Sequence, residues 1–145
     1  MKKVFLLFAM MMAFVTFASA QGTKISVSAS EKQAMMDPVV EALQGLIAKF
    51  DGTYKPGTTI DEVFQISDFE ILIKGKVNYK STNCGDVRTD YKVKMIVEGS
   101  KTYAEPSIYT PYGAFGGLVI TGYEWDNVGY KTQVKHYSSS LLKSR

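Results

Sequence analysis

The residue types that most often perform covalent chemistry are scarce in this chain of 145 residues. Cys84 is the only cysteine and His136 the only histidine, so a thiol and imidazole dyad has one possible composition. Such a dyad needs the base within hydrogen-bond reach of the thiol, and nothing in the spacing of the two residues indicates that contact. A single histidine also excludes a metal site built from several histidines. We therefore expect no catalytic residue and no metal site.

Carboxylates and glycines give no stronger indication of catalysis. Asp61 and Glu62 are adjacent, and we expect them on a solvated loop rather than acting as a general acid and base. Gly113, Gly116 and Gly117 lack the preceding strand, the following helix and the lysine that a phosphate-binding loop requires. The sequence predicts a protein that is not an enzyme and that needs no cofactor.

Aromatic side chains provide the first candidate for a binding site. Tyr123 and Trp125 share one strand parity, which is opposite to that of Leu118 and Ile120. One of these two sets has to face away from the core unless both faces of the strand are covered. Exposed rings would stack on sugar rings or grip a peptide, whereas the alternative is that Tyr123 and Trp125 belong to the core. The candidate ligand-binding residues are Tyr109, Tyr112, Phe115, Tyr123 and Trp125.

Basic side chains provide a second candidate surface. They occupy the solvent-facing positions of the predicted strands, where the opposing carboxylates are Glu70, Asp90 and Glu98. A locally basic face attracts anionic lipids or polysaccharides even when the net charge is small. The alternative is an ordinary solvated face whose lysines deter pairing between sheet edges. The candidate basic face comprises Lys74, Lys76, Lys80, Arg88, Lys92, Lys94, Lys131 and Lys135.

The first twenty residues have the order of a secretory signal peptide. Lys2-Lys3 precede an apolar run from Val4 to Phe17, and Ala18-Ser19-Ala20 follows as a cleavage motif. The alternative is an uncleaved anchor, but the run is short for a bilayer span and ends in small residues. We expect a protein exported to the periplasm or the cell exterior, with residues 21–145 as a single soluble α+β domain.

Removal of this segment changes the charge of the chain. The full chain has a net charge of +3, and without Lys2-Lys3 it carries 15 Lys and Arg against 14 Asp and Glu. Nucleic-acid binding usually requires a strongly basic domain, so we expect no nucleic-acid partner. The lone Cys84 excludes an intramolecular disulfide, which leaves a free, partly exposed thiol or a bond to another molecule.

Two runs of alternating residues organise the predicted fold. From Phe69 to Lys80 and from Asp90 to Val97, apolar or small residues occupy every second position and polar residues fall between them. A period of two indicates strands with one buried and one solvated face. Residues 81–86 are rich in turn formers, so we expect the two strands to close as an antiparallel hairpin.

An amphipathic helix precedes these strands. Ser30 followed by Gln33 fits a capping box that marks its start. Apolar residues then recur at spacings of three and four from Met36 to Phe50, which predicts one face to bury. Asp51-Gly52 should end the helix, with Gly52 available for the left-handed conformation.

Pro38 leaves two alternatives for this helix. Either the helix kinks at Pro38, or its regular part starts with Asp37 as N-cap and Pro38 at the first position. In both cases the apolar stripe belongs to the core. Leu43 and Ile73 are predicted to be buried and to face each other between helix and sheet.

The later strands are less regular. After a tight turn at 98–101, an extended piece runs from Tyr103 to Ile108, and Pro106 suits an edge strand or an irregular connection. Residues 109–117 are predicted to form a loop. Residues 118–125 and 128–137 are predicted to pair as a second hairpin around a tight turn.

The element order is strand, helix and then four to six antiparallel strands. It predicts an α+β domain in which one amphipathic helix packs on one face of a curved sheet. The motifs at Ser30 to Gln33, Ile73-Lys74-Gly75-Lys76 and Glu98-Gly99-Ser100-Lys101-Thr102-Tyr103 carry a resemblance. Over residues 25–108 the chain resembles small exported bacterial proteins of unknown function whose fold is like that of the TATA-binding protein. That resemblance implies a fold and no activity.

A cystatin-like arrangement is the alternative fold, because it also places one helix in a grasping antiparallel sheet. The Gln-x-Val-x-Gly loop of cystatins is missing from this sequence, so inhibition of cysteine proteases is not expected.

Two functions stay open from the sequence. The first is a binding module of the bacterial envelope that recognises a glycan, lipid or peptide through exposed aromatics or the basic face. The second is a structural or interaction protein that joins a larger assembly through its sheet edge or helix. A concave site with exposed aromatics would favour the first, and a long, unpaired, apolar edge strand would favour the second. The sequence identifies neither a partner nor an oligomeric state.

Overall fold

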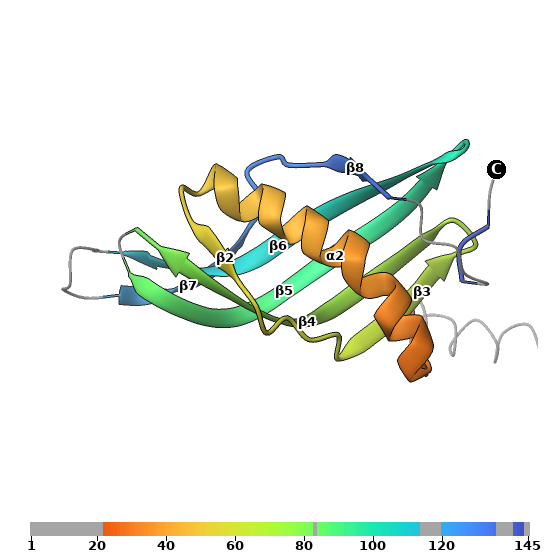
Figure 1. Cartoon of the computed structure of the whole chain (residues 1–145), viewed down its shortest axis with the longest axis horizontal. Helices are drawn as coiled ribbons and strands as arrows, with labels where there is room; N and C mark the ends of the chain where they lie inside the picture. Colours follow the sequence, from red (N-terminus) through yellow and green to blue (C-terminus); the bar gives the residue numbers. More distant parts are fainter. Residues whose placement is uncertain (1–21, 83, 114–119, 136–140, 144–145) are drawn as a thin grey trace, which may run out of the picture.

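The computed structural model describes residues 22–82, 84–113, 120–135 and 141–143, so the predicted signal peptide at 1–20 lies outside the described residues. One helix, α2 (Ala29–Lys49), lies across one face of an antiparallel sheet of eight strands (Figure 1). The predicted α+β class, with one helix on a sheet, is confirmed. The sheet has more strands than the four to six expected; the strand that the sequence did not predict, β2 (Thr53–Lys55), has three residues, too few to show a period of two.

The sheet follows the order β1-β3-β4-β5-β6-β7, and every neighbouring pair is antiparallel. The two remaining strands pair beside this path, β2 with β4 and β8 with β6. The predicted central hairpin is confirmed as β4 and β5, in which Ser81 lies opposite Gly85. The strands are β1 (Thr23–Ile25), β2 (Thr53–Lys55), β3 (Glu62–Ser67), β4 (Glu70–Ser81), β5 (Gly85–Glu98), β6 (Lys101–Gly113), β7 (Ile120–Asp126) and β8 (Thr132–Val134).

Alternation along the strands separates a core face from a solvent face. Ile71, Ile73, Val93 and Met95 have no exposed area and join one core with Leu43 of α2. The residues between them on β4 and β5 are half-buried or exposed, except Leu72. Leu43 and Ile73 are therefore both buried, as predicted. We call the face turned away from α2 the outer face.

The start of α2 lies before the predicted capping box. Ser28 is the N-cap, and its hydroxyl accepts a hydrogen bond from the Glu31 backbone N–H at 3.2 Å. The helix continues through Pro38, so it does not begin at that residue. Proline removes the N–H that would bond to Ala34, and Ala34 lies on the exposed side of the helix, where water can take its place. Within the described ranges, no helix combines the length and apolarity needed to cross a membrane.

The end of α2 is stabilised by a Schellman arrangement in which Asp51 is the left-handed residue. Asp51 has a φ angle of 56°, and its N–H donates to the Ala48 carbonyl at 3.2 Å. The Gly52 N–H donates to the Ile47 carbonyl at 3.0 Å, which completes the pattern of two hydrogen bonds. The predicted end of the helix is confirmed, but the left-handed conformation falls one residue earlier than Gly52.

Strand β6 corrects the predictions for residues 103–117 as far as they are described. It runs unbroken to Gly113, so residues 109–113 form a strand and not a loop, and Pro106 lies in its interior. Pro106 is tolerated because β8 pairs with Thr102 to Ala104 and β7 with Ile108 to Gly113, which leaves a gap between them. The Asn127 side-chain amide donates to the Pro106 carbonyl across this gap. The N and O atoms of a strand residue point to the same edge, so the missing N–H also faces the gap.

The same pairing corrects the predicted second hairpin. Strands β7 and β8 do not pair with each other but lie one after the other along β6. The turn between them contains Val128 and Gly129, both with positive φ.

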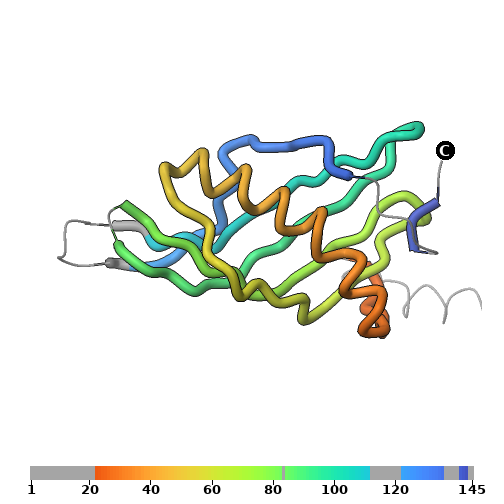
Figure 2. Tube along the Cα trace, viewed as in Figure 1, coloured from red at the N-terminus to blue at the C-terminus, as the bar shows by residue number. Residues whose placement is uncertain are grey.

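The sheet extends further than the helix that covers it. The turn between β4 and β5, together with β7, lies beyond the C-terminal end of α2 (Figure 2). This end of the sheet carries the candidate aromatic residues.

Candidate functional site

Three of the candidate aromatic residues gather on the outer face where β6 meets β7. Tyr109 lies directly opposite Trp125, and Pro111 lies opposite Tyr123. The ring of Tyr109 has its centroid 5.4 Å from that of Tyr123 and 5.2 Å from that of Trp125. The buried Thr89 hydroxyl donates to the Tyr109 carbonyl at 2.6 Å and fixes this strand to β5. We call Tyr109, Tyr123 and Trp125 the aromatic platform.

The exposure of the platform decides between the two sequence-based alternatives. Tyr123 is 43% exposed and Trp125 is 44% exposed, so this pair faces solvent instead of the core. Phe115 lies outside the described residues, as does the side chain of Tyr112. The platform is thus known for three of the five candidate residues.

Lys92 contacts the platform from a neighbouring strand. Its Nζ lies 4.5 Å from the ring centroid of Trp125. Lys92 is on β5 and Trp125 on β7, so the lysine stem spans the intervening strand β6. Partial burial lowers the pKa of Lys92 from its ordinary value, and the charges of Lys74 and Lys94 lower this pKa further. The contact was not predicted, because the register between strands far apart in sequence does not show in the pattern of either strand.

Three of the eight candidate basic side chains are paired with the three carboxylates named with them. Lys76 pairs with Asp90. Lys94 lies 4.0 Å from Glu70, and Lys131 lies 2.9 Å from Glu98, whose hydrogen bond raises the pKa of Lys131. Of the remaining candidates, Lys80 lies opposite Asp86, Arg88 bonds to Asn78, and the Lys135 backbone N–H donates to Glu41 of α2 at 3.3 Å.

Lys74 and Lys92 form a different arrangement, which we call the lysine pair. They lie directly opposite each other on β4 and β5. Like charges in this position repel, at a cost of a few tenths of a kcal/mol to about 1 kcal/mol. Lys74 also lies near an aromatic ring, with Nζ 5.2 Å from the centroid of Phe64. Two positive charges of the outer face therefore lie opposite each other, and one of them, that of Lys92, lies next to Trp125.

A pocket of about 220 Å³ adjoins Trp125. Its carboxylates already have partners: Glu62 lies 3.3 Å from Lys24, Asp90 pairs with Lys76, and Asp61 accepts from the Thr59 hydroxyl at 3.3 Å. Glu62 is the first residue of β3, so only Asp61 of the adjacent acidic pair precedes the strand. The lining residues are Asp61, Glu62, Lys74, Gly75, Asp90, Tyr91 and Trp125.

Gly75 lets the chain before β3 approach the sheet closely enough to form this pocket. A Cβ at Gly75 would lie 1.9 Å from the carbonyl oxygen of Thr59, so no larger residue fits. The same oxygen accepts a hydrogen bond from the Tyr91 hydroxyl at 2.7 Å. These contacts hold residues 59–61 over β4 and place Asp61 at the rim of the pocket.

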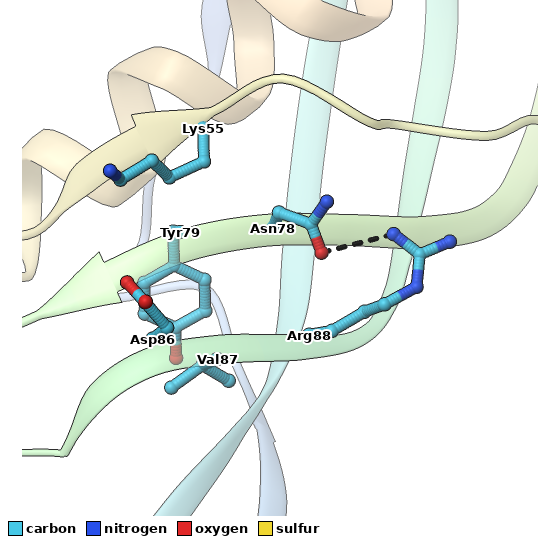
Figure 3. A pocket seen from close by; sticks show the side chains of 6 residues that line it. All are labelled: Lys55, Asn78, Tyr79, Asp86, Val87 and Arg88. Atoms are coloured by element: carbon cyan, nitrogen blue, oxygen red, sulfur yellow. Dashed lines mark hydrogen bonds between the residues drawn. The ribbon is translucent and has the colours of Figure 1, made fainter.

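A second pocket, of about 340 Å³, lies near the turn of the central hairpin (Figure 3). Its guanidinium group has a structural role, because Arg88 donates to the Asn78 side-chain oxygen at 3.0 Å and to the Gly57 carbonyl at 3.2 Å. The Asn78 amide in turn donates to the Pro56 carbonyl at 2.9 Å. These bonds hold residues 56–57 against the hairpin. The lining residues are Lys55, Asn78, Tyr79, Asp86, Val87 and Arg88.

The lone cysteine lies where the sequence places it, in the turn between β4 and β5. Cys84 is half-buried and free, and its backbone N–H donates to the Ser81 hydroxyl at 3.2 Å. His136 lies outside the described residues. In the part of the chain that the structure describes, no group of three or more His, Cys, Asp or Glu side chains is placed to hold a metal ion.

Comparison with known proteins gives no relative: no family model, no curated protein and no solved structure matches this chain. The resemblance to small exported proteins with a fold like the TATA-binding protein therefore stays a prediction from sequence.

Proposed function

We propose that this protein is a non-enzymatic binding module of the bacterial envelope and that it holds a glycan chain on the aromatic platform. The observation that carries the proposal is the exposure of Tyr123 and Trp125 beside Tyr109. Clusters of large rings normally contribute to a core, so a cluster left in solvent is typical of a binding surface.

The chemistry around the platform favours a sugar over a lipid. A sugar ring presents apolar C–H groups on its face and hydroxyl groups on its edge. The Trp125 ring can stack on the face of the sugar. Asp61, Glu62 and Asp90 in the adjoining pocket can accept hydrogen bonds from the hydroxyl groups on its edge. A lipid chain would instead require an apolar cavity, and this pocket is lined largely by charged residues.

Export is part of the proposal. The segment Lys2-Lys3, the apolar run to Phe17 and Ala18-Ser19-Ala20 support it, because together they have the order of a cleavable signal peptide. Envelope polysaccharides would then share a compartment with the mature domain.

The alternative function, joining a larger assembly through the sheet edge or the helix, receives less support at the edge formed by β7. Strand β7 ends the order of the main sheet path, and it carries Glu124 and Asp126. Charged residues on an edge strand oppose pairing with a second sheet. This is not the long, apolar edge that assembly would favour.

The direct test measures polysaccharide binding to the mature protein by calorimetry. Trp125→Ala should weaken binding at least about tenfold, because truncating a central aromatic contact usually has a large effect. Tyr103→Ala is the matched control: Tyr103 is also an aromatic residue of the outer face, where it lies near Lys131 instead of the platform. Unchanged affinity in Trp125→Ala, with both variants folded, would contradict the proposal.

The fluorescence of Trp125, the only tryptophan, provides a second readout. Acrylamide should quench its emission in the free protein, and a bound glycan should protect it. A blue-shifted emission that acrylamide does not quench would place Trp125 inside the protein and remove the platform.

A further inference from the structure

We infer that the glycan is acidic, with a carboxylate that binds Lys92 while its sugar ring stacks at Trp125. This inference rests on the proposed function and adds the chemical class of the ligand. It predicts a uronic-acid-containing polysaccharide.

The register of the sheet supplies the first argument. Lys74 and Lys92 are directly opposite on β4 and β5, where side chains approach most closely. The charge of Lys74 is therefore close enough to lower the pKa of Lys92. An anion bound to Lys92 would offset this repulsion.

The partners of the neighbouring charges supply the second argument. Lys76 and Lys94, which flank the lysine pair, are engaged with Asp90 and Glu70. In the described ranges Lys92 makes no ion pair within 4.0 Å, and its ammonium group contacts the Trp125 ring. Its charge is thus available to a ligand at the platform.

The position of Lys92 supplies the third argument. Its Nζ lies 4.5 Å from the Trp125 ring centroid, so an anion bound to Lys92 lies within reach of a sugar ring stacked there. Partial burial, Lys74 and Lys94 lower the pKa of Lys92, and a bound anion would oppose that effect. The geometry joins one anionic and one apolar subsite.

The pocket carboxylates define the orientation of the ligand. Asp61, Glu62 and Asp90 would repel a carboxylate but accept hydrogen bonds from hydroxyl groups. The acidic group should therefore lie toward Lys92, with the hydroxyl edge of the sugar toward Glu62.

The experiment compares polysaccharides that differ only in charge. Polygalacturonate, alginate and hyaluronan are each tested by calorimetry against their carboxyl-reduced, neutral forms. At least one acidic form should bind about tenfold or more tightly than its neutral counterpart, and added salt should shrink the difference.

Variants locate the effect at the lysine pair. Lys92→Gln should abolish the preference for the acidic form, whereas Lys92→Arg keeps the charge and should retain the preference. Lys101→Gln is the matched control, since this exposed lysine lies at the start of β6, where it is paired in register with Glu98. Retention of the preference in Lys92→Gln would overturn the inference.

The outcomes separate this inference from the proposed function. If neutral forms bind at Trp125 as tightly as acidic forms, the inference fails and the proposed function stands. If none of the polysaccharides binds in either form, both fail. If inorganic phosphate displaces the acidic polysaccharide at equal molar concentration of anionic groups, the site recognises an anion without the sugar ring, and the inference is overturned.

Discussion

The stability of the core should depend on pH in the alkaline range, because the side chains of Tyr79 and Tyr91 are buried. Burial raises the pKa of Tyr79 from 10.0 to about 12, and burial, aided by the charge of Asp61, raises the pKa of Tyr91. A phenol with a higher pKa in the folded than in the unfolded protein holds its proton more tightly when folded. Its contribution to stability is complete below the unfolded pKa and is lost as the pH rises through the folded pKa.

The free energy of unfolding should therefore fall between pH 10 and about pH 12, by at most about 1.4 kcal/mol per pH unit for each phenol. Tyr79→Phe removes one ionising group while keeping the ring, so the fall should become shallower. Urea denaturation at a series of alkaline pH values measures this slope. Tyr103→Phe, on the outer face near Lys131, is the control, and equal slopes in Tyr79→Phe and the parent would be inconsistent with the assignment.

At the level of single residues, the sequence predicts which side chains share a face but not which ones meet. The parity of Tyr123 and Trp125 presented two alternatives, and the exposed fractions of these two side chains select the one in which they face solvent. The Lys92 contact depends on side-chain reach across β6, which no local pattern encodes. The pocket at Asp61 depends on Gly75, which allows the backbone approach of Thr59.

Helix α2 is held to the sheet by its apolar stripe. Leu43 has no exposed area, and Leu43→Ala should lower the free energy of unfolding by roughly 2 to 5 kcal/mol, as large-to-small core changes do. Chemical denaturation measures the change. Gln44→Ala is the control on the exposed side of the same helix and should change stability by less than about 0.5 kcal/mol. An unaltered midpoint in Leu43→Ala would show that the core is wrongly assigned.

Gly45 allows Tyr130 to pack against α2. A Cβ at Gly45 would lie 1.9 Å from the Tyr130 hydroxyl and 2.6 Å from the adjacent ring carbon. Alanine favours a helix over glycine by about 1 kcal/mol, but displacing a packed ring costs about 1 to 3 kcal/mol. Gly45→Ala should therefore destabilise the protein slightly, against its helix propensity.

A double-mutant cycle tests this balance, with unfolding free energy as the readout. In a Tyr130→Ala background the obstacle is gone, so Gly45→Ala should stabilise the protein by up to about 1 kcal/mol. The sign of the effect should thus reverse between the two backgrounds. The same sign in both would mean that Tyr130 does not pack on Gly45.

At the level of elements, strands with a regular alternating pattern could be predicted from the sequence. The proline inside β6 and the exact helix caps could not, because other parts of the structure determine them. Strands β4 and β5 alternate over many residues, so their hairpin follows from the sequence alone. Pro106 indicated an edge strand or a loop, yet it lies inside β6. It faces the gap between β7 and β8, where the Asn127 side-chain amide donates to the Pro106 carbonyl. Ser28 and Asp51 replace Ser30 and Gly52 at the helix ends, because several residues nearby could cap and tertiary packing selects among them.

For the whole molecule, the sequence predicts one helix on an antiparallel sheet but not the path of the last strands. That path depends on β7 and β8 sharing β6, which is a choice between distant partners and not a local preference. The aromatic platform results from that choice, since Tyr109 meets Trp125 only in this register. The basic face was also predicted as a set of residues, and the structure shows that ion pairs engage three of them, Lys76, Lys94 and Lys131.

The separation of the two sheet faces has a consequence for how this protein can evolve. Residues that face α2 and residues of the outer face alternate along the same strands. Lys92, Tyr123 and Trp125 do not belong to the core beneath α2, so substitutions there should change stability less than substitutions in the core. The outer face can therefore change one residue at a time at little cost to the fold.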